Sequence, residues 1–263
     1  MRPVNVRKKV SSKFMKKGKV YLVGAGPGDP GLLTMKARKI LAQADVIVYD
    51  RLIARRILQE LPKQIVKIYV GKRSGTNSIP GQDAIPRILI TNAEKGKLVV
   101  RLKGGDPFLF GRGGEEIQRL KEAGVNFEVV PGITSALAVP AYAGIPVTHR
   151  KYASSVAIVT GHEDPRKSKR VDWKKLATAV DTIVILMGVS NLQSILESLV
   201  EGGCNTETPV AIIERGTTKR QRVTIGNIRT ITAQAVERRI KSPAVIIVGD
   251  VVNLQKELSW FKS

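Results

Sequence analysis

The sequence predicts an α/β protein made of two α/β domains with a ligand-binding cleft. Short apolar runs alternate with amphipathic stretches along the first half, the alternation restarts after Pro131, and glycine, proline and acidic residues gather where apolar runs end. Such alternation is typical of βαβ units in a mostly parallel sheet. We therefore expect a basic arm over 1–18, a first domain over 19–131 and a second over 132–263.

In the first domain, apolar runs predict the strands. They are KVYLV, DVIVY, IVKIYV, LVVRL and FEVV, at 19–23, 45–49, 65–70, 98–102 and 127–130. Amphipathic stretches between them predict helices near 31–43, 53–60, 82–95 and 114–123. Strands joined through helices run parallel, so their carboxyl ends meet at one edge of the sheet.

The second domain is expected to hold a mixed sheet. Its strands are predicted at 154–160, 182–187, 209–213, 222–226 and 243–249, and its helices near 133–142, 172–179, 190–201 and 230–240. Only a turn separates the third of these strands from the fourth, which favours an antiparallel pair. Two polar stretches, 74–83 and 163–170, predict loops.

Composition excludes several classes of protein. The 263 residues are 43% hydrophobic, enough for a sizeable core, but no apolar run approaches the roughly 20 residues of a membrane span. Cys204 is the only cysteine, which excludes an intrachain disulfide or a thiolate zinc cluster and fits the reducing cytoplasm. Since the only histidines are His149 and His162, we expect no metal site. The amino terminus lacks the apolar core of a secretory signal, and fits a flexible basic arm or an organelle transit peptide.

The chain is strongly basic. Its net charge is +22, from 44 Lys and Arg against 22 Asp and Glu, and residues 1–20 supply +8 of it. Such a field steers polyanions, of which nucleic acid is the commonest. Aromatic residues are only 5% and none interleaves with the basic runs, so stacking platforms for single strands are absent. Many cations, such as Lys36, Arg38 and Lys39, fit a solvated helix face. Charge alone does not choose between polyanions.

The segment GAGPGDPG at 24–31 admits two interpretations. It follows a strand and precedes a helix, and Asp50 lies 22 residues after its third glycine, as in dinucleotide-binding turns. Against a nucleotide, Pro27 stiffens the loop, and Asp29 with Pro30 is typical of an N-cap and a first helical residue. Such a cap fills the helix N-terminus that a pyrophosphate needs. In the second interpretation the glycines shape the wall of a cleft.

Charged residues and glycines close several strands. Asp50 follows the strand at 45–49 and Lys72 follows the strand at 65–70, so both lie at the carboxyl edge, where open α/β sheets bind ligands. The segment KGGDP at 103–107 ends another strand. Its glycines suit a tight turn and let the backbone approach a ligand closely, whereas a turn alone does not explain the Asp-Pro pair.

Several of these segments belong to a series of motifs that runs along the chain. The series is VYLVGAGPGDPGLLT (20–34), DVIVYDRL (45–52), YVGKR (69–73), RLKGGDPFLFGRGGEE (101–116), VVPGIT (129–134), AGIPVTHR (143–150), TGH (160–162), LMGV (186–189) and SPAVIIVGDVV (242–252). From about Lys19 to Trp260 the chain resembles the tetrapyrrole methylases. The resemblance implies their two-domain fold with the active-site cleft between the domains, S-adenosyl-L-methionine as methyl donor, and a homodimer. The activity it implies is C-methylation of uroporphyrinogen III at C2 and C7, through precorrin-1 to precorrin-2, which feeds sirohaem and cobalamin biosynthesis.

The resemblance also implies roles for residues. Asp50 is the implied proton acceptor and Lys72 the proton donor. The implied cofactor-binding residues are Pro27, Gly104, Gly105, Asp106, Leu109, Thr134, Ser135, Met187 and Gly216. Within this set we expect the Asp106 carboxylate to accept from an ammonium or hydroxyl group; Met187 on its own also fits a core residue. Because guanidinium groups bind carboxylates bidentately, the expected substrate-binding residues are Arg51, Arg73, Arg101, Arg112 and Arg150, together with Glu115. Any one of these arginines can instead pair with Glu115 or Glu116.

Other functions fit parts of the pattern. A later precorrin methyltransferase, diphthine synthase or a ribosomal-RNA ribose methyltransferase would share the fold, and the last suits a charge of +22. A basic nucleic-acid-binding module is the non-enzymatic alternative, and it predicts steeply salt-dependent binding. The motifs at 101–116 and 143–150 resemble the enzymes that methylate uroporphyrinogen III in more detail. We therefore expect that activity, with neither a membrane nor a nucleic-acid partner.

Overall fold

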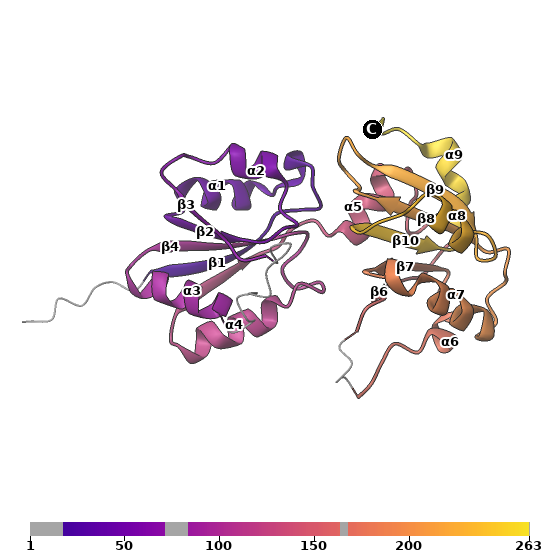
Figure 1. The fold of residues 1–263 in the computed structure, drawn as a ribbon, viewed down its shortest axis with the longest axis horizontal. Coiled ribbons are helices and arrows are strands. Elements are labelled where there is room, and N and C mark those ends of the chain that lie inside the picture. The colour runs from indigo at the N-terminus through magenta and orange to yellow at the C-terminus, as the bar shows by residue number, and fades with distance from the viewer. Residues whose placement is uncertain (1–17, 72–83, 164–167, 263) are drawn as a thin grey trace, which may run out of the picture.

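The computed structural model describes residues 18–71, 84–163 and 168–262. Figure 1 shows two lobes, each built on one sheet with helices packed against it. We call the described residues up to Val130 the N-terminal lobe and those from Ser135 onward the C-terminal lobe. The segment 131–134 joins them.

The N-terminal lobe is a parallel sheet of strand order β3-β2-β4-β1-β5. Its strands are β1 Lys19–Gly24, β2 Val46–Tyr49, β3 Val66–Tyr69, β4 Leu98–Lys103 and β5 Asn126–Val130. Helices α1 Met35–Gln43 and α2 Arg55–Gln59 cover one face, and α3 Ala84–Glu94 and α4 Gly113–Glu122 cover the other (Figure 1). Alternate strand residues therefore enter two cores: Ile47 packs with α1 and α2, and its neighbours Val46 and Val48 pack with α3 and α4.

The C-terminal lobe has strand order β6-β7-β10-β8-β9. Its strands are β6 Val156–Thr160, β7 Thr182–Leu186, β8 Pro209–Glu214, β9 Arg222–Asn227 and β10 Ala244–Val248. Strands β6 and β7 are parallel, whereas β10 is antiparallel to both β7 and β8, and β8 to β9. Helix α5 Ser135–Tyr142 packs on one face; α6 Trp173–Leu176, α7 Leu192–Glu201 and α8 Ile231–Glu237 pack on the other.

The predicted α/β class, the parallel first sheet and the mixed second sheet are confirmed, and the helices differ in detail. The predicted helix over 31–43 is divided into a 3-10 turn, η1 Pro30–Leu32, and α1, because Asp29 caps the first and Thr34 caps the second. The predicted helix over 172–179 is the short α6. The C-terminal turns η3 Asp250–Leu254 and α9 Gln255–Leu258 were not predicted. The predicted loop at 74–83 lies outside the described residues, as does 164–167 of the second loop.

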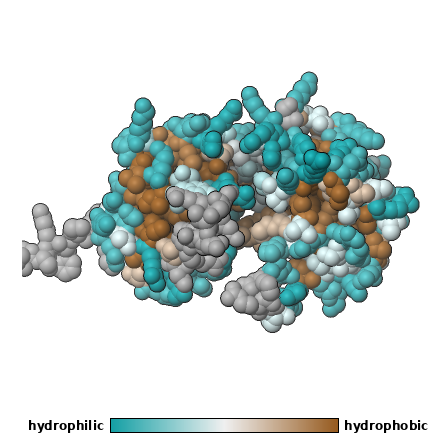
Figure 2. Space-filling model, viewed as in Figure 1, coloured by the Kyte–Doolittle hydropathy of each residue, from teal (hydrophilic) through white to brown (hydrophobic). Residues whose placement is uncertain are grey.

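Polar side chains cover much of the visible surface of both lobes (Figure 2). Lys36, Arg38 and Lys39 of α1 are all exposed, which confirms the prediction of a solvated helix face. Over the three described stretches, no helix is both long and apolar enough to cross a bilayer.

Candidate active site

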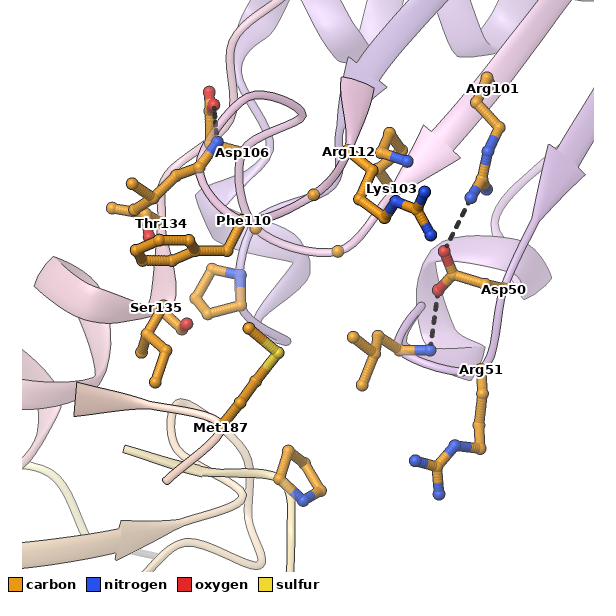
Figure 3. A pocket seen from close by; sticks show the side chains of 18 of the residues that line it. Asp50, Arg51, Arg101, Lys103, Asp106, Phe110, Arg112, Thr134, Ser135 and Met187 are labelled. Carbon is orange, nitrogen blue, oxygen red and sulfur yellow. Dashed lines mark hydrogen bonds and ion pairs between the residues drawn. The ribbon is translucent and has the colours of Figure 1, made fainter. Parts of the chain in front are cut away.

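A cavity of about 790 Å³ lies between the two lobes. The N-terminal lobe lines it with the β1–η1 loop, with residues that follow β2 and β4, and with the first turns of α3 and α4; the C-terminal lobe lines it with the start of α5, the end of β7 and the segment before β10. Figure 3 shows Ser135 and Met187 on one side and Asp50, Arg51 and Arg101 on the other. The cavity therefore lies at the carboxyl edge of the parallel sheet, where ligands of α/β proteins bind.

Most of the residues singled out in the sequence lie together around this cavity. They are Pro27, Asp50, Arg51, Arg101, Gly104, Gly105, Asp106, Leu109, Arg112, Glu115, Thr134, Ser135 and Met187. Gly216 and Arg150 are not among the lining residues, and Lys72 and Arg73 lie outside the described residues. Sequence reasoning missed Lys103, Phe110, Arg119 and Pro243, which also line it, and named Glu116 only as a possible partner of an arginine.

Three glycines pack backbone against backbone at the wall of the cavity. A Cβ on Gly132 would lie 2.6 Å from the Gly24 Cα and closer still to the Gly105 carbonyl oxygen. Gly105 has φ +65°, and it exchanges two backbone hydrogen bonds with Gly26, at 2.8 and 3.2 Å. No larger residue fits this junction of β1, the loop after β4 and the segment joining the lobes. The glycines thus hold these three segments together by direct packing of their backbones.

Asp106 holds this wall in place. Its Oδ1 accepts from the backbone N–H groups of Phe108 and Leu109, at 2.8 and 3.2 Å, and its Oδ2 accepts from the Gly132 N–H at 3.0 Å. Figure 3 shows the carboxylate pointing away from Met187. The expectation that this carboxylate accepts from a ligand therefore differs from the structure, in which backbone amides from two segments engage both of its oxygens.

A buried network of charges forms the opposite side of the cavity. Arg101 donates to Asp50 Oδ2 at 3.1 Å and to Glu116 Oε1 at 3.3 Å, and the Lys103 ammonium lies 2.8 Å from the same Glu116 oxygen. Burial, followed by the charge of Arg101, lowers the pKa of Lys103. Glu116 Oε2 is buried without a hydrogen-bond partner among the described residues. Two cations and two carboxylates thus balance within the network.

The position of Arg101 corrects its predicted role. Its side chain is only 4% exposed, and Nη1 donates to the carbonyl oxygens of Val48 and Leu102 while Nε and Nη2 bind carboxylates. A guanidinium engaged in this way orients Asp50 and has little capacity left for a substrate carboxylate. The sequence left Glu116 open as a partner for it and gave no sign of Asp50, which lies 51 residues away.

The remaining predicted arginines differ in their exposure, in their ion pairs and in their place relative to the cavity. Arg51 is exposed, extends away from the Asp50–Arg101 pair in Figure 3, and makes no ion pair or hydrogen bond through its side chain within the described part of the chain. Arg112 pairs with Glu115, the alternative that the sequence had left open. Arg150 is exposed in a turn outside the cavity lining, which differs from its predicted place. Arg51 is therefore the lining cation best placed to receive an anionic ligand.

Met187 faces the cavity and does not belong to the core: it is 46% exposed and has a left-handed φ of 57°. Phe110 and Arg112, across the cavity, share this uncommon backbone conformation, with φ of 52° and 58°. Such residues cluster at functional sites. Gly216, an implied cofactor-binding residue, packs against α5, where an added Cβ would lie 2.9 Å from Val139 Cβ. Its lack of a side chain makes room for that helix.

The β1–η1 loop does not present an open helix N-terminus. Asp29 Oδ1 accepts from the Gly31 N–H at 2.7 Å and Pro30 follows as the first residue of η1, which confirms the predicted cap. The next helix is closed by Thr34, which accepts from the Ala37 N–H at 3.1 Å. A pyrophosphate would have to displace one of these caps, so the geometry favours a cleft wall over a dinucleotide turn.

Comparison with known proteins identifies the family. Residues 19–232 match the family described as Tetrapyrrole (Corrin/Porphyrin) Methylases. The chain belongs to the tetrapyrrole methylase family. Among its tetrapyrrole methylase relatives, the S-adenosyl-L-methionine-dependent uroporphyrinogen III methyltransferase of Methanosarcina barkeri is 56% identical over 90% of this chain and 93% of its own length. The uroporphyrinogen-III C-methyltransferase of Bacillus subtilis is 50% identical over 94% of this chain and 95% of its own.

A solved structure of the family has the same fold. It is the uroporphyrin-III C-methyltransferase of Thermus thermophilus in complex with S-adenosylhomocysteine. Its TM-score is 0.77 at 41% sequence identity, over 90% of this chain and 94% of that one. This tetrapyrrole methylase therefore shares both its sequence motifs and its two-lobed architecture with an enzyme that binds the product form of the methyl donor.

Proposed function

We propose that this protein transfers methyl groups from S-adenosyl-L-methionine to C2 and C7 of uroporphyrinogen III, giving precorrin-2 through precorrin-1. One observation carries the proposal: a single cavity joins a wall of glycines with a side that carries Asp50 and Arg51, whose side chain makes no ion pair within the described residues. Relatives that are 50–56% identical over at least nine-tenths of the chain, and that are named for this reaction, support it.

The glycine side suits the methyl donor. Gly104 and Gly105 line the cavity from the N-terminal lobe without a side chain, and Met187 lines it from the C-terminal lobe. Pro27, Leu109, Thr134 and Ser135 complete this half in our proposal, whereas Asp106 and Gly216 act indirectly, by holding the wall and by seating α5. The donor supplies a methyl group on a positively charged sulfur, which is already an activated leaving group. The main task of the chain is then alignment, which contributes up to about 7–11 kcal/mol in favourable cases.

The network side suits the tetrapyrrole. After an electron-rich pyrrole carbon has gained the methyl group, a proton must leave the macrocycle, and we assign its removal to Asp50. Asp50 Oδ1 accepts from the Leu52 N–H at 3.1 Å and Oδ2 from Arg101, which together fix its orientation. Lys72 is its proposed complement as proton donor. The eight carboxylates of the substrate are assigned to Arg51 and to Arg112 with Glu115, which line the cavity, and to Arg73.

We further propose the biological setting of the enzyme. The chain divides into domains at 19–131 and 132–263, since every strand before the segment 131–134 enters one sheet and every strand after it enters the other. It acts in the cytoplasm and serves sirohaem or cobalamin biosynthesis. A homodimer is supported by exposed apolar side chains such as Ile133 and Leu137, and analytical ultracentrifugation tests it.

The direct test is a product assay. The purified protein is incubated with S-adenosyl-L-methionine and freshly generated uroporphyrinogen III, and mass spectrometry is expected to find two added methyl groups. The D50A variant serves as the control for background transfer. Absence of methylated tetrapyrrole would contradict the proposal. Transfer of labelled methyl groups to ribosomal RNA would favour the ribose methyltransferase instead, and transfer only to a later precorrin would favour a later enzyme of the same fold.

A further inference from the structure

A ring of hydrogen bonds joins the lobes outside the lining of the cavity. The Tyr142 hydroxyl, at the end of α5, donates to Asp29 Oδ2 at 2.8 Å, and the Asp29 backbone N–H donates to Thr217 Oγ1 at 3.2 Å. Gln221 closes the ring: its Oε1 accepts from the Thr217 N–H at 2.8 Å, and its Nε2 donates to the Tyr142 carbonyl oxygen at 3.2 Å. We call these four residues the interlobe ring.

The C-terminal half of the ring is held firmly. Thr217 and Gln221 are 3% and 6% exposed, so their polar atoms have few other partners. The Tyr142 ring packs against Trp260 and Phe261, with centroids 5.0 and 4.9 Å away, and the Trp260 indole N–H donates to the Ala141 carbonyl oxygen at 2.9 Å. Tyr142 and Thr217 therefore present their groups to Asp29 from a rigid base.

The N-terminal half of the ring is a single residue in the β1–η1 loop. Asp29 lies two residues after Pro27, which lines the cavity, and it caps η1 with its other carboxylate oxygen. Gly28, between them, packs so closely on the C-terminal lobe that an added Cβ would lie 2.9 Å from Thr218 Cγ2. The position of Pro27 relative to Met187 thus depends on how Asp29 is held.

We propose that the interlobe ring is a positioning device, in which Tyr142 and Thr217 hold Asp29 and thereby set the spacing between the Pro27 loop and the C-terminal wall of the cofactor half of the cavity. Tyr142 touches neither cofactor nor substrate and acts through Asp29. Tyr142 is thus a positioning residue of the site described above. Its effect on cofactor binding rests on the proposed function.

The hydroxyl of Tyr142 stays a donor at all physiological pH values. Burial, together with its hydrogen bond to Asp29, raises the pKa of Tyr142 to about 12. A hydrogen bond to a carboxylate is one of the stronger hydrogen bonds in proteins. When the bond between Tyr142 and Asp29 is lost, the ligand must itself restore the spacing between the Pro27 loop and the C-terminal wall, and its affinity falls roughly tenfold.

The first experiment measures binding and turnover. Y142F removes the hydroxyl and keeps the ring, and T217V removes the second contact to Asp29. For each variant, calorimetry gives the dissociation constant of S-adenosylhomocysteine and initial rates give KM and kcat. We expect the dissociation constant and the KM for S-adenosyl-L-methionine to rise about tenfold, with kcat changed less than about twofold, because saturating cofactor restores the spacing. The double variant is expected to lose little more than either single one.

The matched control is Y152F. Tyr152 also lies in the C-terminal lobe, with its ring 5.1 Å from that of His149, and its hydroxyl makes no hydrogen bond within the described residues. Y152F is expected to behave as the wild type, and thermal unfolding checks that all variants fold. Wild-type affinity for S-adenosylhomocysteine in folded Y142F and T217V would overturn the proposed effect on binding.

A second experiment needs no ligand and separates this inference from the proposed function. Spin labels are attached at K39C on α1 and E197C on α7, two exposed positions in different lobes, in a C204S background. Pulsed electron paramagnetic resonance is expected to give a narrow distance distribution, unchanged by Y152F and broadened by Y142F. An unchanged distribution in Y142F would overturn the ring as a positioning device. If Y142F broadens it in a protein that neither binds S-adenosylhomocysteine nor methylates uroporphyrinogen III, the ring stands and the proposed function fails.

Discussion

Replacing Gly132 with alanine tests the backbone wall of the cavity. The new Cβ would lie 2.6 Å from the Gly24 Cα and 2.8 Å from the Gly24 carbonyl carbon, and closer still to the Gly105 carbonyl oxygen. All of these atoms are backbone, so no side chain can rotate to relieve the clash. Overpacking costs typically 1–3 kcal/mol, and we expect about 3 kcal/mol here because three segments must move together.

This strain appears either as lost stability or as a displaced wall. In G132A we expect the free energy of unfolding in urea to fall by about 3 kcal/mol, or the affinity for S-adenosylhomocysteine to fall roughly 100-fold as Gly105 moves, since 1.4 kcal/mol is a factor of ten. The matched control is G114A on α4, where no atom lies within 4 Å of the added Cβ. It is expected to be neutral or to stabilise by up to about 1 kcal/mol. Wild-type stability and affinity in G132A would refute the reasoning.

Three further predictions concern the charged side of the cavity. D50A is expected to lower the rate of methyl transfer by a factor of about 10² to 10⁴, as loss of a general base does, while calorimetry shows S-adenosylhomocysteine binding almost unchanged; the reverse pattern would show that the role of Asp50 is misassigned. R51M is expected to raise the KM for uroporphyrinogen III about tenfold with unchanged thermal unfolding. R101M is expected to lower the free energy of unfolding by about 3–5 kcal/mol, because it leaves Asp50 without its buried cation and Glu116 with Lys103 alone. An opposite assignment of the two effects would count against Arg101 as a positioning residue. Because the pKa of Lys103 is lowered in the folded protein, the unfolded chain binds the proton of this side chain more tightly. The free energy of unfolding, measured by urea titration, should therefore rise with pH between that lowered pKa and the ordinary value of 10.5. This rise should be absent in K103M.

The architecture could be predicted because it depends on local patterns. Runs such as VIVY and AVIIV are buried on both faces of their sheets, so they are apolar along their whole length and stand out from the amphipathic helices between them. The C-terminal turns η3 and α9 were missed because they are short and carry no clear period. The division of the first helix depended on two separate caps, Asp29 and Thr34, of which only the first was recognised.

The site was predicted in its location and only partly in its contacts. Strand ends located the cavity, and the close spacing of Arg112 and Glu115 left their pairing open as an alternative. Arg101 and Lys103 alternate along β4 and so share one side of the strand, a signal that could have marked both as one cluster. Their carboxylate partners come from the residue after β2 and from α4, and Tyr142 meets Asp29 across 113 residues. Contacts of that kind depend on tertiary packing, which single-sequence patterns do not carry.

The most direct test of the whole account is a crystal structure of the protein soaked with S-adenosylhomocysteine. The account predicts the ligand in the cavity between the lobes, with backbone contacts at Gly104 and Gly105 and with Met187 on its other side. Binding at any other place, or an empty cavity at saturating ligand, would contradict it.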